Sequence, residues 1–247
     1  MIINSKIRIN SDLGEGTGVE KDIMPFLNSC SIACGGHTGD KSSMTDTILI
    51  AKKYDVNIGA HPSYPDKENF GRKNISISNA DLSNSLMSQI DDLERIARSL
   101  ETSLNHIKLH GALYNFSAND LETASIIIEL MKSKYSDKTL YVPYGSLISR
   151  LAIENNIKIY YEVFLDRNYN NDLSLVSREN NNSMILDYQK MLKRLENVIN
   201  DNKIQTIGGD YKKILADTFC VHGDSLEIAS VIRDLFNEIN KHNLEIE

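Results

Sequence analysis

The stretch LSNSLMSQIDDLERIARSLETSLNHIKLH, residues 82–110, places a helical pattern directly before a short β-type run. In its first part, apolar residues recur every three or four positions and form one stripe: Leu82, Leu86, Ile90, Leu93, Ala97 and Leu100. Residues 107–109, Ile-Lys-Leu, then have the composition of a short strand. A helix that leads into a short strand is part of a βαβ unit, and repetition of that unit builds a parallel sheet.

The same alternation continues on both sides of this stretch. Further β-type runs give the following set of predicted strands: residues 7–10, 31–34, 56–59, 107–109, 140–142, 158–161, 205–207 and 218–221. Seven or eight mostly parallel strands separated by helices indicate an α/β fold, a single (β/α)-barrel-like domain over residues 1–247. The Asn-rich residues 168–183 lack a clear period, and we expect them to form a long loop over one end of the barrel.

Two further helices are predicted from their start signals. Asn119 with Glu122, and Asp224 with Glu227, have the spacing of a capping box, in which two side chains satisfy free backbone N–H groups. The helix after Asp224 has one apolar face, and we expect it to close the fold: Ile228, Ile232, Leu235 and Ile239.

Composition and charge narrow the classes of function. The chain has 34 acidic and 27 basic residues, a net charge of −7, and no basic stripe, so nucleic acid is not an expected partner. No basic leader or apolar run of membrane length is present, and we expect a cytoplasmic protein without a membrane partner. Three cysteines without a secretion signal are expected to be reduced, with Cys30 and Cys34 as small core residues.

Histidine and acidic residues collect at the ends of the predicted strands. Four of the six histidines follow strand C-termini: His37, His61, His110 and His222. Acidic residues hold similar positions: Asp12, Glu15, Glu162, Asp166 and Asp224. Because the C-terminal ends of parallel strands meet on one face, where active sites lie, we predict a shared functional pocket. Any one such histidine is more often structural, and Asp224 could serve only as a helix cap.

Lys108 and His110 alternate with apolar neighbours in the fourth predicted strand, so both side chains point to the barrel interior or its mouth. Burial lowers a lysine pKa, which would make Lys108 a proton carrier; an ion pair with an inward carboxylate is the equal alternative. The run Gly14-x-Gly16-x-Gly18 is neither a P-loop nor a dinucleotide fingerprint. The sequence therefore contains no standard motif for holding ATP.

Six blocks of sequence together resemble one family. They are SDLGEG at 11–16, SIACGGHTGD at 31–40, GAHPSYPD at 59–66 with FGR at 70–72, KLHGALYN at 108–115, EVFLDRNY at 162–169 and CVHGD at 220–224. In order and spacing they are similar to the LamB/YcsF family, the A subunit of bacterial 5-oxoprolinase. That family usually has Asn, Gly, Pro and Ala where this chain has Gly14, Asn69, Leu109 and Leu165, and none of these differences removes a histidine or a carboxylate.

The resemblance implies a barrel of the polysaccharide deacetylase type and a reaction in which 5-oxoproline, ATP and water give glutamate, ADP and phosphate. It also implies that this chain acts together with B and C subunits. ATP would make a resistant lactam easier to open by phosphorylating its oxygen, and this chain would carry out the hydrolytic part.

Roles follow as hypotheses for the candidate residues. Asp12 or Glu15 would act as general base, and His222 or Lys108 would protonate the departing nitrogen, with Asp224 as a further catalytic candidate. Four residues are candidates for substrate binding: Arg72, Arg167, Tyr114 and Asn115. Either arginine could hold the substrate carboxylate through two hydrogen bonds. A divalent metal such as zinc could be held by His37, His61 and His110 with Asp12, with one position open for water.

Two other functions fit the same sequence. A metal-dependent deacetylase or sugar hydrolase of the related barrel type would act on N-acetylated sugars without ATP. A non-catalytic subunit would bind 5-oxoproline and present it to partner enzymes, and its pocket residues would then orient the substrate rather than move protons.

Overall fold

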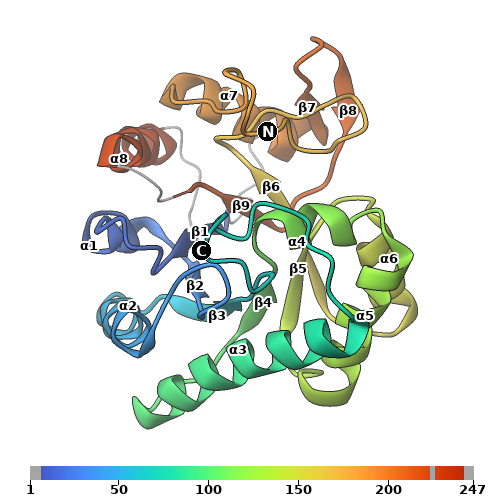
Figure 1. Ribbon diagram of the computed structural model, residues 1–247. Helices are drawn as coiled ribbons and strands as arrows, with labels where there is room; N and C mark the ends of the chain where they lie inside the picture. Colours follow the sequence, from blue (N-terminus) through green and yellow to red (C-terminus); the bar gives the residue numbers. More distant parts are fainter. Residues whose placement is uncertain (1–6, 223–225, 242–247) are drawn as a thin grey trace.

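Seven parallel strands close into a barrel in the computed structural model, which describes residues 7–222 and 226–241 (Figure 1). In order around the barrel they are β1 (Ile9–Leu13), β2 (Ser29–Ala33), β3 (Asn57–His61), β4 (His106–Lys108), β5 (Thr139–Pro143), β6 (Ile159–Phe164) and β9 (Thr218–Cys220). Strand β9 pairs with both β6 and β1 and so closes the ring. All the strand C-termini therefore lie at one rim of the barrel.

Helices pack outside the barrel (Figure 1). They are α1 (Glu20–Ile23), the 3₁₀ turn η1 (Met24–Phe26), α2 (Lys41–Lys53), α3 (Asn79–Ser99), α4 (Gly111–Ser117), α5 (Leu121–Lys134), α6 (Leu147–Glu154), α7 (Tyr188–Asp201) and α8 (Leu226–Lys241). The predicted stripe is buried along α3 from Leu82 to Ala97, with Leu93 completely inaccessible to solvent, whereas Leu100 follows the helix end and is half-buried. None of the described helices is long and apolar enough to cross a membrane.

The strands alternate between two environments. Outward-facing residues such as Ile107 and Phe219 join the apolar core between barrel and helices. The alternate residues point into the barrel, and many of them are polar and hydrogen-bonded to one another. Ser29 Oγ lies 3.2 Å from Tyr141 Oη and Ser31 Oγ lies 3.1 Å from His106 Nε2, and both contacts join strands that are not neighbours. Between the paired strands β1 and β9, Asn10 Nδ2 donates to Thr218 Oγ1 at 2.8 Å. The interior of this barrel is thus a polar column.

Two details differ from the expectations drawn from sequence. The seventh predicted strand, at 205–207, is not part of the barrel: β7 (Lys203–Gln205) pairs antiparallel with β8 (Tyr211–Lys213) in a hairpin outside it. A short apolar run does not reveal which partner a strand will find. Helix α5 is capped by Asp120, whose carboxylate accepts from the Thr123 N–H at 2.8 Å, and not by Asn119. The predicted cap at Asp224 lies outside the described residues.

Truncation of the α3 stripe should weaken the whole domain. The Leu93→Ala variant leaves a cavity between α3 and the barrel, and we expect a loss of about 2–5 kcal/mol in the free energy of unfolding. Urea unfolding measures it, with Ser88→Ala on the exposed face of the same helix as the control. Equal stability of the two variants would show that this face of α3 does not pack as described.

Candidate active site

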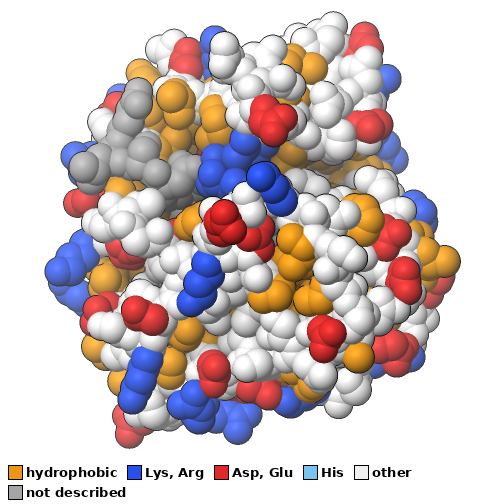
Figure 2. All heavy atoms as spheres, in the orientation of Figure 1, with side chains coloured by type: hydrophobic (Ala, Val, Ile, Leu, Met, Phe, Trp, Pro, Cys, Tyr) orange, Lys and Arg blue, Asp and Glu red, His pale blue; other side chains and the backbone are white. Residues whose placement is uncertain are grey.

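A cavity of about 780 Å³ opens at the C-terminal rim of the barrel, under the 168–183 loop. Its walls include almost every polar residue predicted from sequence: Asp12, Glu15, His61, Arg72, Lys108, His110, Tyr114, Asn115, Arg167 and His222. His37 is buried beside this cavity, next to His110. Figure 2 shows basic and acidic side chains close together near the middle of one face. Asp224 lies outside the described residues, so the structure does not place it.

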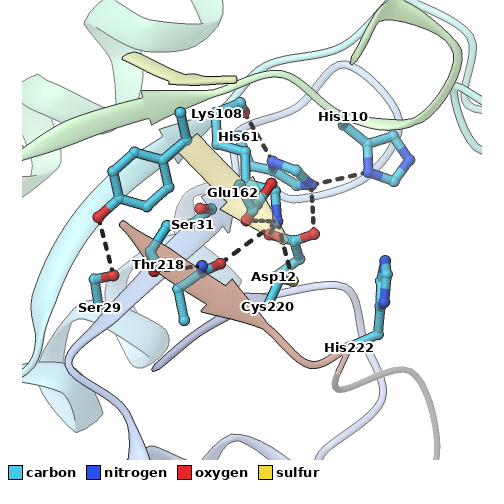
Figure 3. Close-up of polar contacts among 12 residues, drawn as sticks. Asp12, Ser29, Ser31, His61, Lys108, His110, Glu162, Thr218, Cys220 and His222 are labelled. Carbon is cyan, nitrogen blue, oxygen red and sulfur yellow. Dashed lines mark hydrogen bonds and ion pairs between the residues drawn. The ribbon is translucent and has the colours of Figure 1, made fainter. Parts of the chain in front are cut away.

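A buried lysine joins two carboxylates at the floor of the cavity (Figure 3). Lys108 Nζ lies 2.9 Å from Asp12 Oδ1 and 2.8 Å from Glu162 Oε1. Burial alone would lower the pKa of Lys108, but the charges of Asp12 and Glu162 raise it well above its ordinary value. Of the two alternatives for Lys108, the structure therefore contains the ion pair.

The two carboxylates respond differently to this shared cation. Burial would raise the pKa of Asp12, but the neighbouring His61 and Lys108 lower it below its ordinary value. For Glu162 burial is the larger influence, and its pKa is raised even though Lys108 opposes this. Asp12 is thus ionised at neutral pH.

Three histidines and Glu15 form a compact cluster beside Asp12. His110 Nδ1 lies 3.0 Å from His61 Nε2, and Glu15 Oε1 lies 3.1 Å from His37 Nε2 and 3.4 Å from His110 Nδ1. The rings of His37 and His110 stack in parallel with centroids 3.6 Å apart. One ligand atom from each of the four residues lies within 4.8 Å of the others, an arrangement compatible with a divalent metal ion. Glu15 is thus a member of this set that the sequence did not assign to the metal, and Asp12, which it did assign, lies beside the set with Oδ2 3.4 Å from His61 Nε2.

Backbone carbonyls fix two of these rings. His61 Nδ1 donates to the Lys108 carbonyl at 2.8 Å, and His110 Nε2 donates to the Phe70 carbonyl at 2.9 Å. The second contact needs the 70–72 segment to pass close to the start of α4. Gly111 permits this, because it adopts φ +55° and a Cβ there would lie 2.6 Å from the Gly71 carbonyl oxygen.

A second imidazole and carboxylate pair lies on the other side of Asp12. Asp166 Oδ2 accepts from His222 Nδ1 at 2.8 Å and from the His222 backbone N–H at 2.9 Å. The His222 ring stacks on Phe164 with centroids 5.2 Å apart. From sequence, Asp166 and Glu162 are placed after the sixth strand, but neither receives a role. Their signal was that Glu162 and Asp166 fall on the same side of the chain at period two, alternating with apolar Val163 and Leu165, the same pattern that singled out Lys108.

The two arginines proposed for the substrate differ in how they are held. Arg167 lines the cavity, but its Nη2 donates to the Val176 carbonyl at 2.6 Å and its Nε to the Ser183 carbonyl at 3.4 Å, so the side chain ties down the 168–183 loop. Arg72 also lines the cavity and has its guanidinium 4.9 Å from the Phe70 ring centroid. Arg178, from the loop itself, is a further basic residue of the wall, and no role was predicted for it from the sequence.

The chain matches a known family over nearly its whole length. The model of the LamB/YcsF family matches residues 7–247. The chain belongs to the LamB/YcsF family. A protein from Pyrococcus horikoshii that is named as the A subunit of 5-oxoprolinase is 35% identical over 241 residues, which cover 94% of each chain. The resemblance predicted from the six sequence blocks is confirmed.

Solved structures agree with the predicted fold. The lactam utilization protein from Thermus thermophilus superposes with a TM-score of 0.89 at 27% identity, over 98% of this chain and 99% of that one. A family 4 carbohydrate esterase from Streptomyces lividans, in complex with acetate, has a TM-score of 0.52 at 9% identity, over 98% of this chain and 92% of that one. The second likeness concerns the fold alone, and the prediction of a deacetylase-type barrel is confirmed.

Removal of the buried cation should destabilise the barrel in a pH-dependent way. Because the pKa of Lys108 is raised, its stabilising contribution is complete below its unfolded value near 10.5 and is lost only as the pH rises through the higher folded value. The Lys108→Met variant leaves two buried carboxylates without a cation, and we expect a loss of about 3–5 kcal/mol at neutral pH.

The loss should shrink as the pH falls, because Asp12 and Glu162 can then bind protons. Urea unfolding at a series of pH values measures this dependence. Lys132→Met is the matched control, since Lys132 forms an exposed pair with Glu129, and exposed pairs contribute about 0–1 kcal/mol. A deficit that does not change with pH would argue against unpaired carboxylates as its cause.

Proposed function

We propose that this chain is the A subunit of an ATP-dependent 5-oxoprolinase, which opens 5-oxo-L-proline to L-glutamate together with B and C subunits. Relatives at about 35% identity over nearly the full length are named as the A subunit of 5-oxoprolinase, and that name implies further subunits. The observation that carries the proposal is the single cavity in which Asp12, the histidine cluster and His222 meet. A water-derived nucleophile and a leaving nitrogen need these groups on two sides of one substrate.

ATP enters the proposal as a co-substrate of the complex. An unstrained lactam resists water because its amide resonance must be broken and its amine is a poor leaving group. Phosphorylation of the lactam oxygen weakens that resonance, and this chain then completes the hydrolysis. The sequence has no P-loop or dinucleotide fingerprint, so the proposal gives this chain the hydrolytic part.

The geometry suggests how the roles divide among the acidic and basic groups. Asp12 is ionised, lines the cavity and lies 3.4 Å from His61 Nε2, and we assign it the role of general base. Glu15 lies within the histidine cluster and is the weaker candidate for that role. Lys108, held between Asp12 and Glu162, orients the base, which leaves His222 as the donor of a proton to the ring nitrogen.

Substrate binding is assigned to the wall of the cavity above these groups. Arg72 and Arg167, which both line the cavity, are proposed to hold the substrate carboxylate. Tyr114 and Asn115 of α4 line the same space and are proposed to contact the ring. An arginine can hold a carboxylate through two parallel hydrogen bonds, which would fix the ring relative to Asp12 and His222.

A divalent metal ion is proposed to occupy the cluster of Glu15, His37, His61 and His110. His61 and His110 each donate one ring N–H to a carbonyl, so in the neutral rings the two nitrogens that face each other at 3.0 Å both carry lone pairs. Two lone pairs at this distance repel unless a cation lies between them. A tetrahedral ion with bonds of about 2.1 Å separates its ligand atoms by roughly 3.4 Å, near the separations observed.

The donor set indicates which ions are suited to the cluster. Three imidazoles and one carboxylate are preferred by zinc and similar transition metals rather than by magnesium or calcium. Burial keeps His61 neutral by lowering its pKa to about 4, as metal binding by an imidazole requires. Such an ion, when bound, supplies Lewis-acid polarisation of a carbonyl or phosphoryl oxygen.

Metal content tests the cluster directly. Protein purified without added metal should contain about one divalent ion per chain by elemental analysis, because three imidazoles and a carboxylate are ligands that hold such an ion tightly. A double variant, His37→Ala with His110→Ala, should lose the ion. His222→Ala is the matched control, because it removes a histidine from the same cavity but outside the cluster, and it should keep the ion. Wild-type protein that neither contains nor binds zinc, cobalt or manganese would remove the metal from the proposal.

Activity is tested by ATP-dependent release of glutamate from 5-oxoproline, with this chain alone and with B and C subunits. Asp12→Asn should lower kcat by about 10²–10⁴-fold while binding of 5-oxoproline is retained, because a general base contributes about that much. The exposed Ser88→Ala variant should keep full activity. Full turnover by both Asp12→Asn and His222→Ala would favour a subunit that only presents the substrate. Deacetylation of N-acetylated sugars without ATP would favour the deacetylase alternative.

A further inference from the structure

Strand register brings Asp166 and His222 together. Phe164 of β6 pairs with Cys220 of β9, and the Leu165 N–H donates to the Cys220 carbonyl at 2.9 Å. Asp166 lies two residues after Phe164, and His222 lies two residues after Cys220. Both therefore stand at the rim where the two strands end. The two side chains are therefore neighbours because of the backbone pairing, although 56 positions separate them in the sequence.

The Asp166 carboxylate fixes the His222 ring in one orientation. Its Oδ2 accepts from both the ring Nδ1 and the backbone N–H, so the ring is held relative to its own main chain. Phe164 supports one face of the ring. With Nδ1 occupied, Nε2 is the nitrogen left for a ligand, and Figure 3 shows the His222 ring extending toward the space beside Asp12 and His110.

The carboxylate is well placed to act electrostatically. Asp166 is completely buried, whereas the His222 side chain keeps 12% of its surface exposed, toward the cavity that it lines. Oδ1 of Asp166 accepts no hydrogen bond in the described part of the chain. Burial would raise the pKa of Asp166, but the charge and hydrogen bonds of His222 lower it, so the carboxylate is ionised beside the ring.

Other charged groups face Asp166, and they do not replace His222. Arg178 of the 168–183 loop lowers the Asp166 pKa less than His222 does. The Asp166 charge also acts to raise the pKa of Arg167 and of Arg194. Their guanidinium groups, however, donate to backbone carbonyls, Arg167 in the 168–183 loop and Arg194 at the end of β6. His222, by contrast, hydrogen-bonds this carboxylate through both its ring and its backbone.

We propose that Asp166 is the positioning residue for the proton donor: it holds His222 with Nδ1 protonated and Nε2 in the cavity, and its buried charge stabilises the imidazolium. This rests on the proposed function for the identity of the proton acceptor, the ring nitrogen. The proton leaves Nε2 for that nitrogen as its bond to the carbonyl carbon breaks, and the neutral imidazole takes up a proton from solvent afterwards. A fixed carboxylate acts in this way on a histidine in other hydrolytic sites.

Nitrogen NMR of the full chain, with ¹⁵N-labelled histidine, tests the arrangement without any substrate. The His222 signals are assigned by their loss in His222→Gln. In the wild type, neutral His222 should be the Nδ1–H tautomer, and Asp166→Asn, which keeps the shape but not the charge, should lower the His222 pKa by about one unit or more. Asp46→Asn, an exposed change on α2, should leave both properties unaltered.

Kinetics of the complete complex test the consequence. Asp166→Asn should lower kcat at least about tenfold with little change in KM, and the alkaline limb of the kcat profile should move to lower pH by the shift that NMR measures. In a His222→Ala background, Asp166→Asn should cause no further loss, because the two residues act as a unit.

The outcomes separate this inference from the proposed function. An Nε2–H tautomer in the wild type, or a His222 pKa that is the same in Asp166→Asn and Asp46→Asn, would overturn the inference. The tautomer is measured in the wild type, so this result counts even if Asp166→Asn folds poorly. A shifted His222 pKa with unchanged kcat would overturn the catalytic part. The expected NMR result in a complex that releases no glutamate from 5-oxoproline would contradict the proposed function and leave the Asp166–His222 pairing in place.

Discussion

The ion pairs of Lys108 inside the barrel are the contacts on which the rest of the site depends. A buried lysine is tolerated only if carboxylates offset the loss of hydration, and here Asp12 and Glu162 approach it from different strands within 2.9 Å. Two carboxylates with one cation leave an excess negative charge. The two carboxyl groups share this excess unequally: the pKa of Asp12 is lowered by His61 and Lys108, whereas burial raises the pKa of Glu162. The Asp12 carboxylate, which faces the cavity, is thus held in place by a buried lysine.

Strand order then places the remaining groups around Asp12. Because β1 lies between β9 and β2, Asp12 has His222 on one side and the histidine cluster on the other. Both His61 and His222 contribute to the lowered pKa of Asp12, as expected if it lies between them. The cavity consequently has a cluster suited to a metal ion at one wall and an imidazole paired with a carboxylate at the opposite wall, with an ionised carboxylate between them.

The roof of the cavity depends on buried arginines rather than on apolar packing. Arg167 donates to carbonyls within the 168–183 loop, and Arg194 of α7 donates to carbonyls at the end of β6 and to the Arg167 carbonyl. A loop without regular structure leaves carbonyl groups unpaired, and burial of those groups is costly unless donors are supplied. The arginines that satisfy these carbonyls thereby fix the position of the loop over the cavity.

The sequence by itself determined the alternation of strands and helices, the side of β4 on which Lys108 points, and the strand ends at which histidines and acids collect. These features could be predicted because the spacing of apolar residues and the residue types at turns are properties of the local sequence. Only the tertiary structure decided that Glu15 joins the histidine cluster, that Glu162 shares the lysine, and that residues 205–207 lie outside the barrel. Period fixes the face that a side chain occupies, whereas its neighbour across the barrel depends on strand order and register, which form only when the ring closes.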